Sequence, residues 1–500
     1  MRSSPLPVAM RFPQLILLAL SVQFSSAQIN STLLANESLV PRLAAKTACT
    51  HLQTSLGSTV VQSSGAEYTE SVANTWNFLN AELHPTCIVF PRNSVHVQAA
   101  MKAIYDAKSN YAVQAGAHSA MKGWNNVQDG VLILFSHMKN ASYDPVKDTI
   151  TLEPGIHWDE ALAALEPQGV APVGGGGLSF LSPSNGYAAD NFKELDVVLV
   201  TGELVTVTAT NTYADLFRAL KGGGNRFGIV TRYELYPVHT GTRDDKNYFG
   251  GLIVYNSSSA DALLKATARY VREVNDPKAV LLVFILNNFA GTDGDLSTTY
   301  ATITFYNGPE LPTEIFGEFL SIPAIASELA PMSYLDASAV LGSTSPRGFV
   351  QHYGASALYG DEDLYLDAFQ HWSNFSTAFK DILNLSTLAF TPIPVSQINA
   401  GRQKGGNIIN PPGRRGFAAI QLAQQFDTGI QEISADAQRG IDLLFKQIPP
   451  SPGLPLYLGE SDLHQEVFAS YGDYELLKKT YAKYDPTRFN VEHTQGPIGL

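Results

Sequence analysis

Two glycine-rich turns, about a hundred residues apart, constrain this chain more than any other feature. The first is Gln114-Ala115-Gly116-Ala117-His118-Ser119, which follows a helical pattern over 95–107 and a strand pattern over 111–114. The second is Gly222-Gly223-Gly224-Asn225, which continues through Phe227-Gly228-Ile229. Small residues after a strand let backbone N–H groups approach a pyrophosphate closely. The two turns therefore predict a binding site for a dinucleotide.

The histidine at the end of the first turn suggests which dinucleotide. An imidazole nitrogen can bond to the methyl carbon of an isoalloxazine ring, so His118 is a candidate covalent tether for FAD. The alternative is a histidine that only caps a turn, which the local sequence does not exclude. Together with the second turn, the pattern favours a flavin oxidoreductase.

The charge balance excludes one broad class of protein. The 500 residues carry 33 Lys and Arg against 46 Asp and Glu, a net charge of −13. Sequence-independent binding to nucleic acid or to an anionic membrane needs a basic face, so neither is expected. The length is sufficient for two or three domains, or for one large two-lobed enzyme.

The first residues have the features of a secretory signal peptide. Arg2 and Arg11 precede an apolar run over 15–20, and small residues at 25–27 offer a cleavage site, which predicts a signal peptide over 1–27 and a secreted protein. The apolar run is too short to span a bilayer, and no later stretch is long enough for a membrane anchor. Glycosylation is expected at six sequons, Asn30, Asn36, Asn140, Asn256, Asn374 and Asn384.

The chain has two cysteines, Cys49 and Cys87. In a secreted protein, a pair with no leftover thiol predicts one disulfide. Two cysteines without a nearby histidine cluster cannot build a tetrahedral zinc site, so no metal is expected.

The hydrophobic pattern divides the mature chain into two regions with different arrangements of helix and strand patterns. From 83 to 238, strand and helix patterns alternate and include a hairpin signature at Thr201-Gly202-Glu203. Beyond 238, a helical pattern covers 259–271, long strand patterns cover 280–286 and 299–306, and a second helical pattern covers 361–383. We expect an α+β, two-lobed protein whose second lobe contains an antiparallel sheet covered on one face.

Four segments, in this order, resemble those of a known family: 85–92, the turn at 116–119, 215–225, and Ser470-Tyr471-Gly472 followed by 483–489. The chain resembles the berberine bridge enzyme-like, oxygen-dependent FAD-linked oxidases of the fungal secreted type, which have a flavin domain of the vanillyl-alcohol oxidase type. The resemblance implies an N-terminal segment over 28–82, an FAD-binding domain over 83–238, an inserted α/β substrate lobe over 239–455, and a C-terminal segment over 456–500 that completes the flavin domain.

The resemblance also assigns roles to residues. It implies that His118 attaches covalently to FAD and that Ala115, Gly116, Ala117 and Ser119 surround the pyrophosphate. The segment along the adenosine half of the cofactor would be Asn225, Phe227, Gly228 and Ile229. Neither cysteine lies at the position of the second flavin bond of many relatives, so at most one tether is expected.

This chain departs from the family in a glycine-rich run that normally lines the pyrophosphate and the ring. Here Pro172-Val173-Gly174-Gly175 passes almost directly into Gly176-Gly177-Leu178. The shortening is either a coding segment missing from the sequence as written or a real deletion that weakens FAD binding. We favour the first explanation, because the rest of the cofactor pattern persists.

A second departure concerns the candidate base. The family's Tyr-x-Asn-x-x-Asp element corresponds to Tyr457-Leu458-Gly459-Glu460-Ser461-Asp462, and Glu460 stands where many sugar oxidases have a tyrosine base. Burial can raise the pKa of a carboxyl group enough for it to act as a base. The alternative for Glu460 is a solvated turn residue. A third departure is the Tyr471-Gly472 element, which is one residue shorter than usual.

These observations predict a secreted FAD-dependent oxidase that takes hydride from a small alcohol, sugar or secondary metabolite, with dioxygen as the re-oxidant. Only four tryptophans are present, so no carbohydrate platform is evident and a secondary metabolite is slightly favoured. The alternative is a flavin-free secreted scaffold that lost FAD with the shortened glycine run. Oligomeric state does not follow from the sequence.

Overall fold

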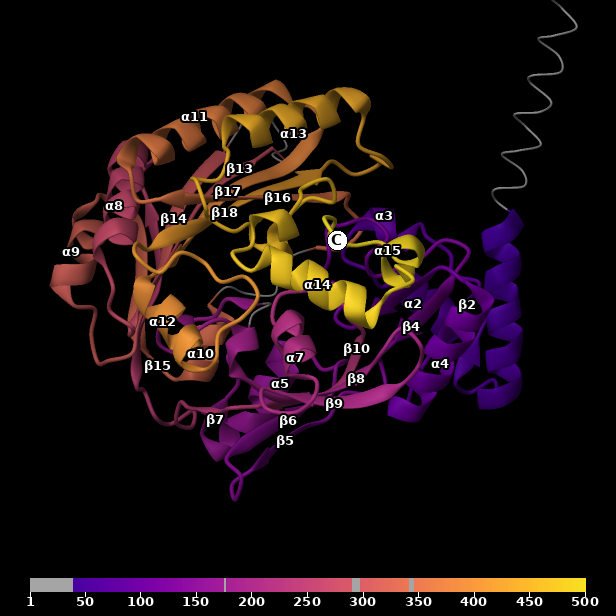
Figure 1. Ribbon diagram of the computed structural model, residues 1–500. Helices are drawn as coiled ribbons and strands as arrows, with labels where there is room; N and C mark the ends of the chain where they lie inside the picture. The colour runs from indigo at the N-terminus through magenta and orange to yellow at the C-terminus, as the bar shows by residue number, and fades with distance from the viewer. Residues whose placement is uncertain (1–38, 175–176, 290–296, 341–345) are drawn as a thin grey trace, which may run out of the picture.

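The computed structural model describes residues 39–174, 177–289, 297–340 and 346–500. The predicted signal peptide, 1–27, and the sequons at Asn30 and Asn36 lie outside the described residues. The chain folds into an α+β protein of two lobes built on three main sheets (Figure 1). The predicted domain boundaries themselves remain predictions.

The first sheet is small and mostly parallel, and it carries the first glycine-rich turn. Its order across the sheet is β1 (Val61–Gln62), β2 (Cys87–Val89), β4 (Val131–Leu134) and β3 (Tyr111–Gln114). The strands β2, β4 and β3 are parallel, which requires crossover connections. The helices of this region are α2 (Ala66–Ala73), α3 (Phe78–Ala81) and α4 (Ser94–Ala107). The predictions of a helix over 95–107 and a strand over 111–114 are confirmed.

A helix over residues 39–56 packs beside this sheet. A disulfide joins Cys49 in that helix to Cys87 in β2, the pair that the sequence predicts. Both cysteines are buried in the same hydrophobic cluster as Met101 and Ile104 of α4. The disulfide therefore ties the start of the described chain to the sheet that bears the turn.

The second sheet is antiparallel and lies next along the chain. Its order is β5 (Ala141–Asp144), β6 (Thr149–Leu152), β10 (Ile229–Leu235), β8 (Phe192–Val198) and β9 (Leu204–Thr208). The β8–β9 hairpin turns at Gly202, whose φ of 86° favours glycine. Other elements of this region are α5 (Trp158–Leu165), β7 (Val170–Ala171), α6 (Ser182–Asn185), α7 (Ala214–Leu220) and β11 (Val238–His239).

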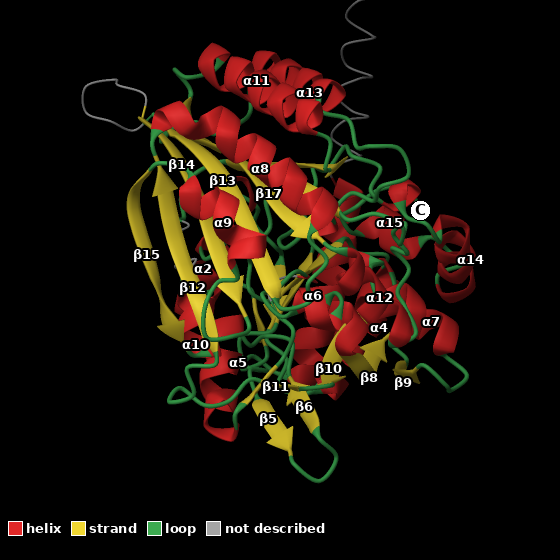
Figure 2. Cartoon of the chain, turned by 90° about the vertical axis from the view of Figure 1, so that its left-hand side faces the viewer, coloured by secondary structure: helices red, strands yellow, loops and turns green. Residues whose placement is uncertain are grey.

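The second lobe is built on a seven-stranded antiparallel sheet. Its order is β15 (Ala324–Met332), β12 (Tyr248–Tyr255), β14 (Ser297–Tyr306), β13 (Ala279–Asn288), β17 (Leu383–Ile393), β18 (Phe417–Phe426) and β16 (Gln351–Tyr359). Figure 2 shows helices along one side of this sheet, namely α8 (Ala260–Glu273), α9 (Thr313–Ser321), α11 (Glu362–Ala378) and α13 (Ala435–Gln447). Trp372 of α11 is fully buried between them and the sheet. Two further helices are α10 (Tyr334–Ala339) and α12 (Val395–Gln403).

The predicted helix over 361–383 is too long at its C-terminal end. α11 ends at Ala378, and Leu383 already begins β17, a strand inside the large sheet. β17 pairs with β13 on one side and with β18 on the other. Pairing on both sides satisfies the backbone of these residues in the sheet, which overrides the local helical pattern.

The C-terminal segment returns to the first lobe, where α14 (Tyr474–Tyr484) lies beside α7 and α15 (Phe489–His493) follows (Figure 1). Arg226, which is 3% exposed, holds this segment. Its guanidinium donates to the carbonyl oxygens of Asn490 (2.7 Å), Thr494 (2.8 Å) and Pro497 (2.9 and 3.0 Å). In return, the Asn490 side chain donates to the Arg226 carbonyl at 2.9 Å. The end of the chain is thus fastened to the second glycine-rich turn.

Replacing Arg226 by methionine should destabilise the protein strongly. The change leaves three buried carbonyl groups without their charged donor, so the free energy of unfolding should fall by about 3 kcal/mol. Urea denaturation followed by fluorescence measures this loss. Arg439→Met is the matched control, because Arg439 pairs with Asp436 at the surface and its removal should cost under about 0.5 kcal/mol. Equal losses for the two variants would contradict the role of Arg226.

Candidate active site

The first glycine-rich turn lies at the carboxyl end of β3, where the chain leaves the small sheet. Ala117 has a φ of 58°, so a non-glycine residue holds the left-handed conformation here. A Cβ at Gly116 would meet only the His157 ring, at 3.9 Å, so the space above the turn is open. Ala115, Gly116 and His118 are exposed. Ser119 turns back to accept a hydrogen bond from Met121 N–H at 3.2 Å.

The ring of Trp76 covers one face of the His118 imidazole. The Trp76 and His118 rings are stacked, with centroids 4.2 Å apart and planes inclined by 12°. Burial lowers the pKa of His118, and the positive charge of Arg347 acts in the same direction. The imidazole is therefore neutral over a wider pH range than a free histidine, which leaves one ring nitrogen unprotonated. The sequence offered no signal for Trp76, which lies 42 residues upstream.

The second glycine-rich turn offers mainly backbone groups to the site. Phe227 and Ile229 are buried in hydrophobic clusters, so their side chains cannot contact a cofactor and only their backbone is available. A Cβ at Gly228 would collide with Val197 Cγ1 and Val198 O at 2.8 Å, so this glycine serves packing. Asn225 is different. Its Nδ2 donates to Gln495 O at 2.8 Å, while its Oδ1 is buried with no partner among the described residues.

Glu460 ends a short helical turn over Leu458–Glu460. Its side chain is half-buried rather than fully solvated. Burial raises the pKa of Glu460 to about 7. Two tyrosines, Tyr353 and Tyr457, lie close enough to Glu460 to interact with its charge. Burial is the main cause that raises their pKa values, and the carboxylate of Glu460 raises them further. Glu460 is therefore a partly buried carboxyl group flanked by two neutral phenols.

One tyrosine connects Glu460 to the turn of His118. Tyr353, on β16, lies 5.2 Å from Trp76 between ring centroids, and Trp76 is stacked on His118. The candidate tether from the small sheet and the candidate base from the C-terminal segment thus meet at one strand of the large sheet. No local sequence pattern could reveal that these residues lie together, because His118, Tyr353 and Glu460 are far apart in the chain.

Comparison with known proteins shows which sequences this chain resembles. The sequence model of an FAD-binding domain matches residues 85–208. An uncharacterised FAD-linked oxidoreductase from Arthroderma benhamiae is 27% identical over 467 residues, which cover 87% of this chain and 91% of that protein. An FAD-dependent monooxygenase from Aspergillus calidoustus is 26% identical, with 90% and 89% covered. The chain is an FAD-linked oxidoreductase.

Solved structures of low sequence identity share the fold of this oxidoreductase. A carbohydrate oxidase from Microdochium nivale superposes with a TM-score of 0.70 at 19% identity, covering 91% of this chain and 100% of the other. Berberine bridge enzyme from Eschscholzia californica gives 0.68 at 13% identity, covering 90% and 99%. The match to an FAD-binding domain and the FAD-linked relatives support FAD as the cofactor of this chain. The alternative of a flavin-free scaffold stays a prediction, which the flavin content of the protein tests.

The residues present fit FAD at two places. The open turn at Gly116 can admit a pyrophosphate against backbone N–H groups. The unpartnered Oδ1 of Asn225 is an acceptor suited to a hydroxyl or amino donor on the cofactor. His118 is exposed, so it would be available to hold the cofactor.

The shortened glycine run lies beside the same site. Gly174 packs on Trp158, since a Cβ there would come within 2.9 Å of the indole ring. Gly177 packs on Tyr457, with its φ of 133° and an added Cβ at 3.2 Å from the phenol oxygen. Gly175 and Gly176, where the sequence departs from the family, lie outside the described residues.

Among the described residues, no group of three or more His, Cys, Asp or Glu side chains could hold a metal ion. No helix in the described ranges is both long and apolar enough to cross a bilayer.

Replacing Trp76 by leucine should raise the pKa of His118 toward its ordinary value. The variant removes the ring that covers the imidazole face, so protonation costs less desolvation. An NMR titration of the imidazole C–H signals in flavin-free protein measures the change. His96 is an internal reference, because burial and Arg92 lower its pKa independently of Trp76. An unchanged His118 titration would show that Trp76 does not set this pKa.

Proposed function

We propose that this FAD-linked oxidoreductase is a secreted oxidase that removes hydride from a small organic substrate. The observation that carries the proposal is Glu460, a buried carboxyl group with a pKa raised to about 7, reached from the His118 turn through Trp76 and Tyr353. A carboxyl group with such a pKa can take up a proton near neutral pH. The placement suits a base that acts next to the isoalloxazine ring.

Each residue has a distinct task in this mechanism. Glu460 accepts the proton from a substrate hydroxyl or amine as the adjacent carbon loses hydride. Tyr353 and Tyr457 remain protonated, because burial raises their pKa values, and the hydroxyl group of Tyr353 can donate a hydrogen bond to the substrate. FAD, when bound, supplies the hydride acceptor and passes the electrons to dioxygen, which is reduced to hydrogen peroxide.

His118 is the proposed covalent attachment site. Bond formation to a ring carbon requires an unprotonated imidazole nitrogen, and the lowered pKa of His118 supplies one. The stacked Trp76 restricts the rotation of the imidazole. A covalent bond would also prevent loss of the cofactor outside the cell.

The surroundings of Glu460 favour one of the three substrate classes. Two tyrosines flank the carboxyl group, and aromatic rings stack on flat, partly apolar molecules. Alcohols, sugars and secondary metabolites all fit the chemistry, and the aromatic surroundings favour the last.

Secretion is supported by residues on the surface and by the disulfide. Asn140, Asn256 and Asn374 are exposed and accessible to glycosylation. Asn384 is a poorer acceptor than its sequon suggests, because it lies in β17 and its amide nitrogen donates to Gln425. The Cys49–Cys87 disulfide suits an oxidising compartment.

Replacing Glu460 by glutamine tests the base. Because a carboxylate is the active form, the rate of flavin reduction in the native enzyme should rise with pH through about 7. The Glu460→Gln variant should bind FAD normally, lose about 10²–10⁴-fold in that rate, and lose the dependence on pH. Stopped-flow absorbance with a panel of alcohols and phenolic metabolites provides the measurement. A variant that reduces its flavin at the native rate would refute the assignment.

The visible spectrum before and after acid precipitation tests the attachment. Flavin absorbance that stays with the pellet establishes a covalent bond, and His118→Ala should release the flavin into the supernatant. His157→Ala is the matched control, because His157 also borders the turn at Gly116 but should not change the outcome. Flavin that stays bound in the His118→Ala pellet would disprove the tether. Folded native protein without any flavin would show that the shortened glycine run abolishes binding.

A further inference from the structure

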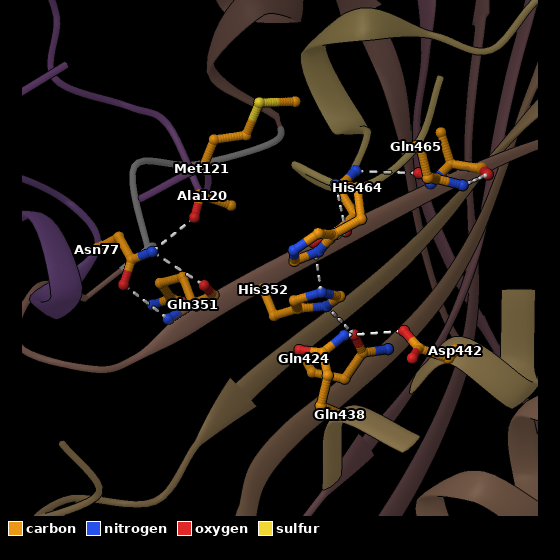
Figure 3. A network of polar contacts seen from close by, with 12 residues as sticks. Asn77, Ala120, Met121, Gln351, His352, Gln424, Gln438, Asp442, His464 and Gln465 are labelled. Atoms are coloured by element: carbon orange, nitrogen blue, oxygen red, sulfur yellow. Dashed lines mark hydrogen bonds and ion pairs between the residues drawn. The ribbon is translucent and has the colours of Figure 1, made fainter. Parts of the chain in front are cut away.

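The first residues of β16, Gln351 and His352, lie between Asn77 on one side and the stretch of His464 and Gln465 on the other (Figure 3). On one side stands Asn77, which is fully buried. Its Nδ2 donates to the carbonyl of Ala120 at 2.6 Å and to the carbonyl of Gln351 at 3.0 Å. Gln351 N–H donates to Asn77 Oδ1 at 3.1 Å. Because Ala120 follows His118 by two residues, this amide fastens the tether turn to β16.

On the other side, His352 fastens the segment of Glu460 to the same strand. The His352 ring is 5% exposed, and its Nε2 lies 3.0 Å from Asp462 Oδ2. Its Nδ1 lies 2.8 Å from Gln424 Oε1 on β18, and the Phe445 ring of α13 stacks on it at 6.0 Å. A ring N–H at either nitrogen can donate to the oxygen that it faces. Asp462 is two residues after Glu460.

A second contact joins this segment to β16. Gln465 Oε1 accepts hydrogen bonds from the backbone N–H groups of Asp462 and Ala355, both at 2.9 Å. Gln465 Nε2 donates to the Ala355 carbonyl at 2.8 Å. The Gln465 side chain therefore pairs with the backbone of Ala355 at the edge strand β16, as a neighbouring strand would, and also binds the backbone of Asp462.

The charges around His352 support an ion pair with Asp462. Burial would raise the pKa of Asp462, but the hydrogen bond and charge of His352 outweigh it and lower that pKa to about 2. The exposed His464 shares the carboxylate through Oδ1 at 3.0 Å. Gln424, from β18, is uncharged, and the nearby Asp442 of α13 accepts from Gln438 at 3.0 Å.

We propose that Asn77, His352 and Asp462 are positioning residues, which hold the Glu460 segment in register with the His118 turn through β16. The proposal rests on the proposed role of Glu460 as the base. Proton removal beside a flavin requires the base within hydrogen-bond reach of the substrate, and a displacement of about 1 Å can cost about 10²-fold in rate. The buried contacts of Asn77, His352 and Asp462, called the clamp below, supply that precision without contacting the substrate.

Asp462→Asn tests the clamp directly. The variant loses the charge that pairs with His352, so amide hydrogen exchange in residues 457–467 should accelerate by about tenfold in the flavin-free and the flavin-bound protein. The rate of flavin reduction should fall by about 10–100-fold with little change in KM and in flavin content. His352→Gln, which retains a donor toward Asp462, should recover part of the rate that His352→Ala loses.

Gln438→Ala is the matched control, because it removes a hydrogen bond to Asp442 in the same region without touching the clamp. It should leave both the exchange and the rate unchanged. If Asp462→Asn does not fold, Gln465→Ala removes the second contact without altering a charge, and the same two changes are expected. Unchanged exchange and rate in whichever variant folds would overturn the proposal.

The results separate this proposal from the proposed function. A Glu460→Gln variant with the native reduction rate would refute the base, whatever Asp462→Asn does. A Glu460→Gln variant that loses the rate, combined with a clamp variant that keeps it, would refute only the positioning role.

Discussion

The structure depends on one buried guanidinium. Arg226 sits between the second glycine-rich turn and the last residues of the chain, and it donates only to backbone carbonyls, those of Asn490, Thr494 and Pro497. A buried cation is tolerated when its N–H groups are hydrogen-bonded, and here they hold residues that lie more than 260 positions later in the chain. Glu460 lies earlier in the same C-terminal segment, and its own stretch is held on β16 by the contacts of Asp462 and Gln465.

Two carboxyl groups, two residues apart, show how environment sets function in this oxidoreductase. Burial without a charged partner raises the pKa of Glu460 to about 7, whereas the His352 hydrogen bond lowers that of Asp462 to about 2. One carboxyl group can therefore exchange a proton near neutral pH, and the other stays charged as a structural anchor. Environments that separate the pKa values of neighbouring acids are a recurring means of dividing such roles.

Much of the fold was predictable because it follows from local periodicity. The helix over 95–107, the strand at 111–114 and the hairpin at Gly202 appear as expected, since each depends on residues close in sequence. The helix over 361–383 was wrong at its end, because Leu383 belongs to a strand held on both sides by distant partners. Phe227 and Ile229 were assigned to the cofactor by resemblance, but their side chains fill the core.

The sequence by itself determined the two glycine-rich turns, the cysteine pair, the candidate residues His118 and Glu460, and a family whose members bind FAD. The tertiary structure decided which of these residues meet. Trp76 behind His118, Tyr353 between the two candidates, and the His352–Asp462 pair come from distant elements. Burial and ring stacking depend on distances in space, and these are set by how sheets and lobes pack rather than by spacing along the chain.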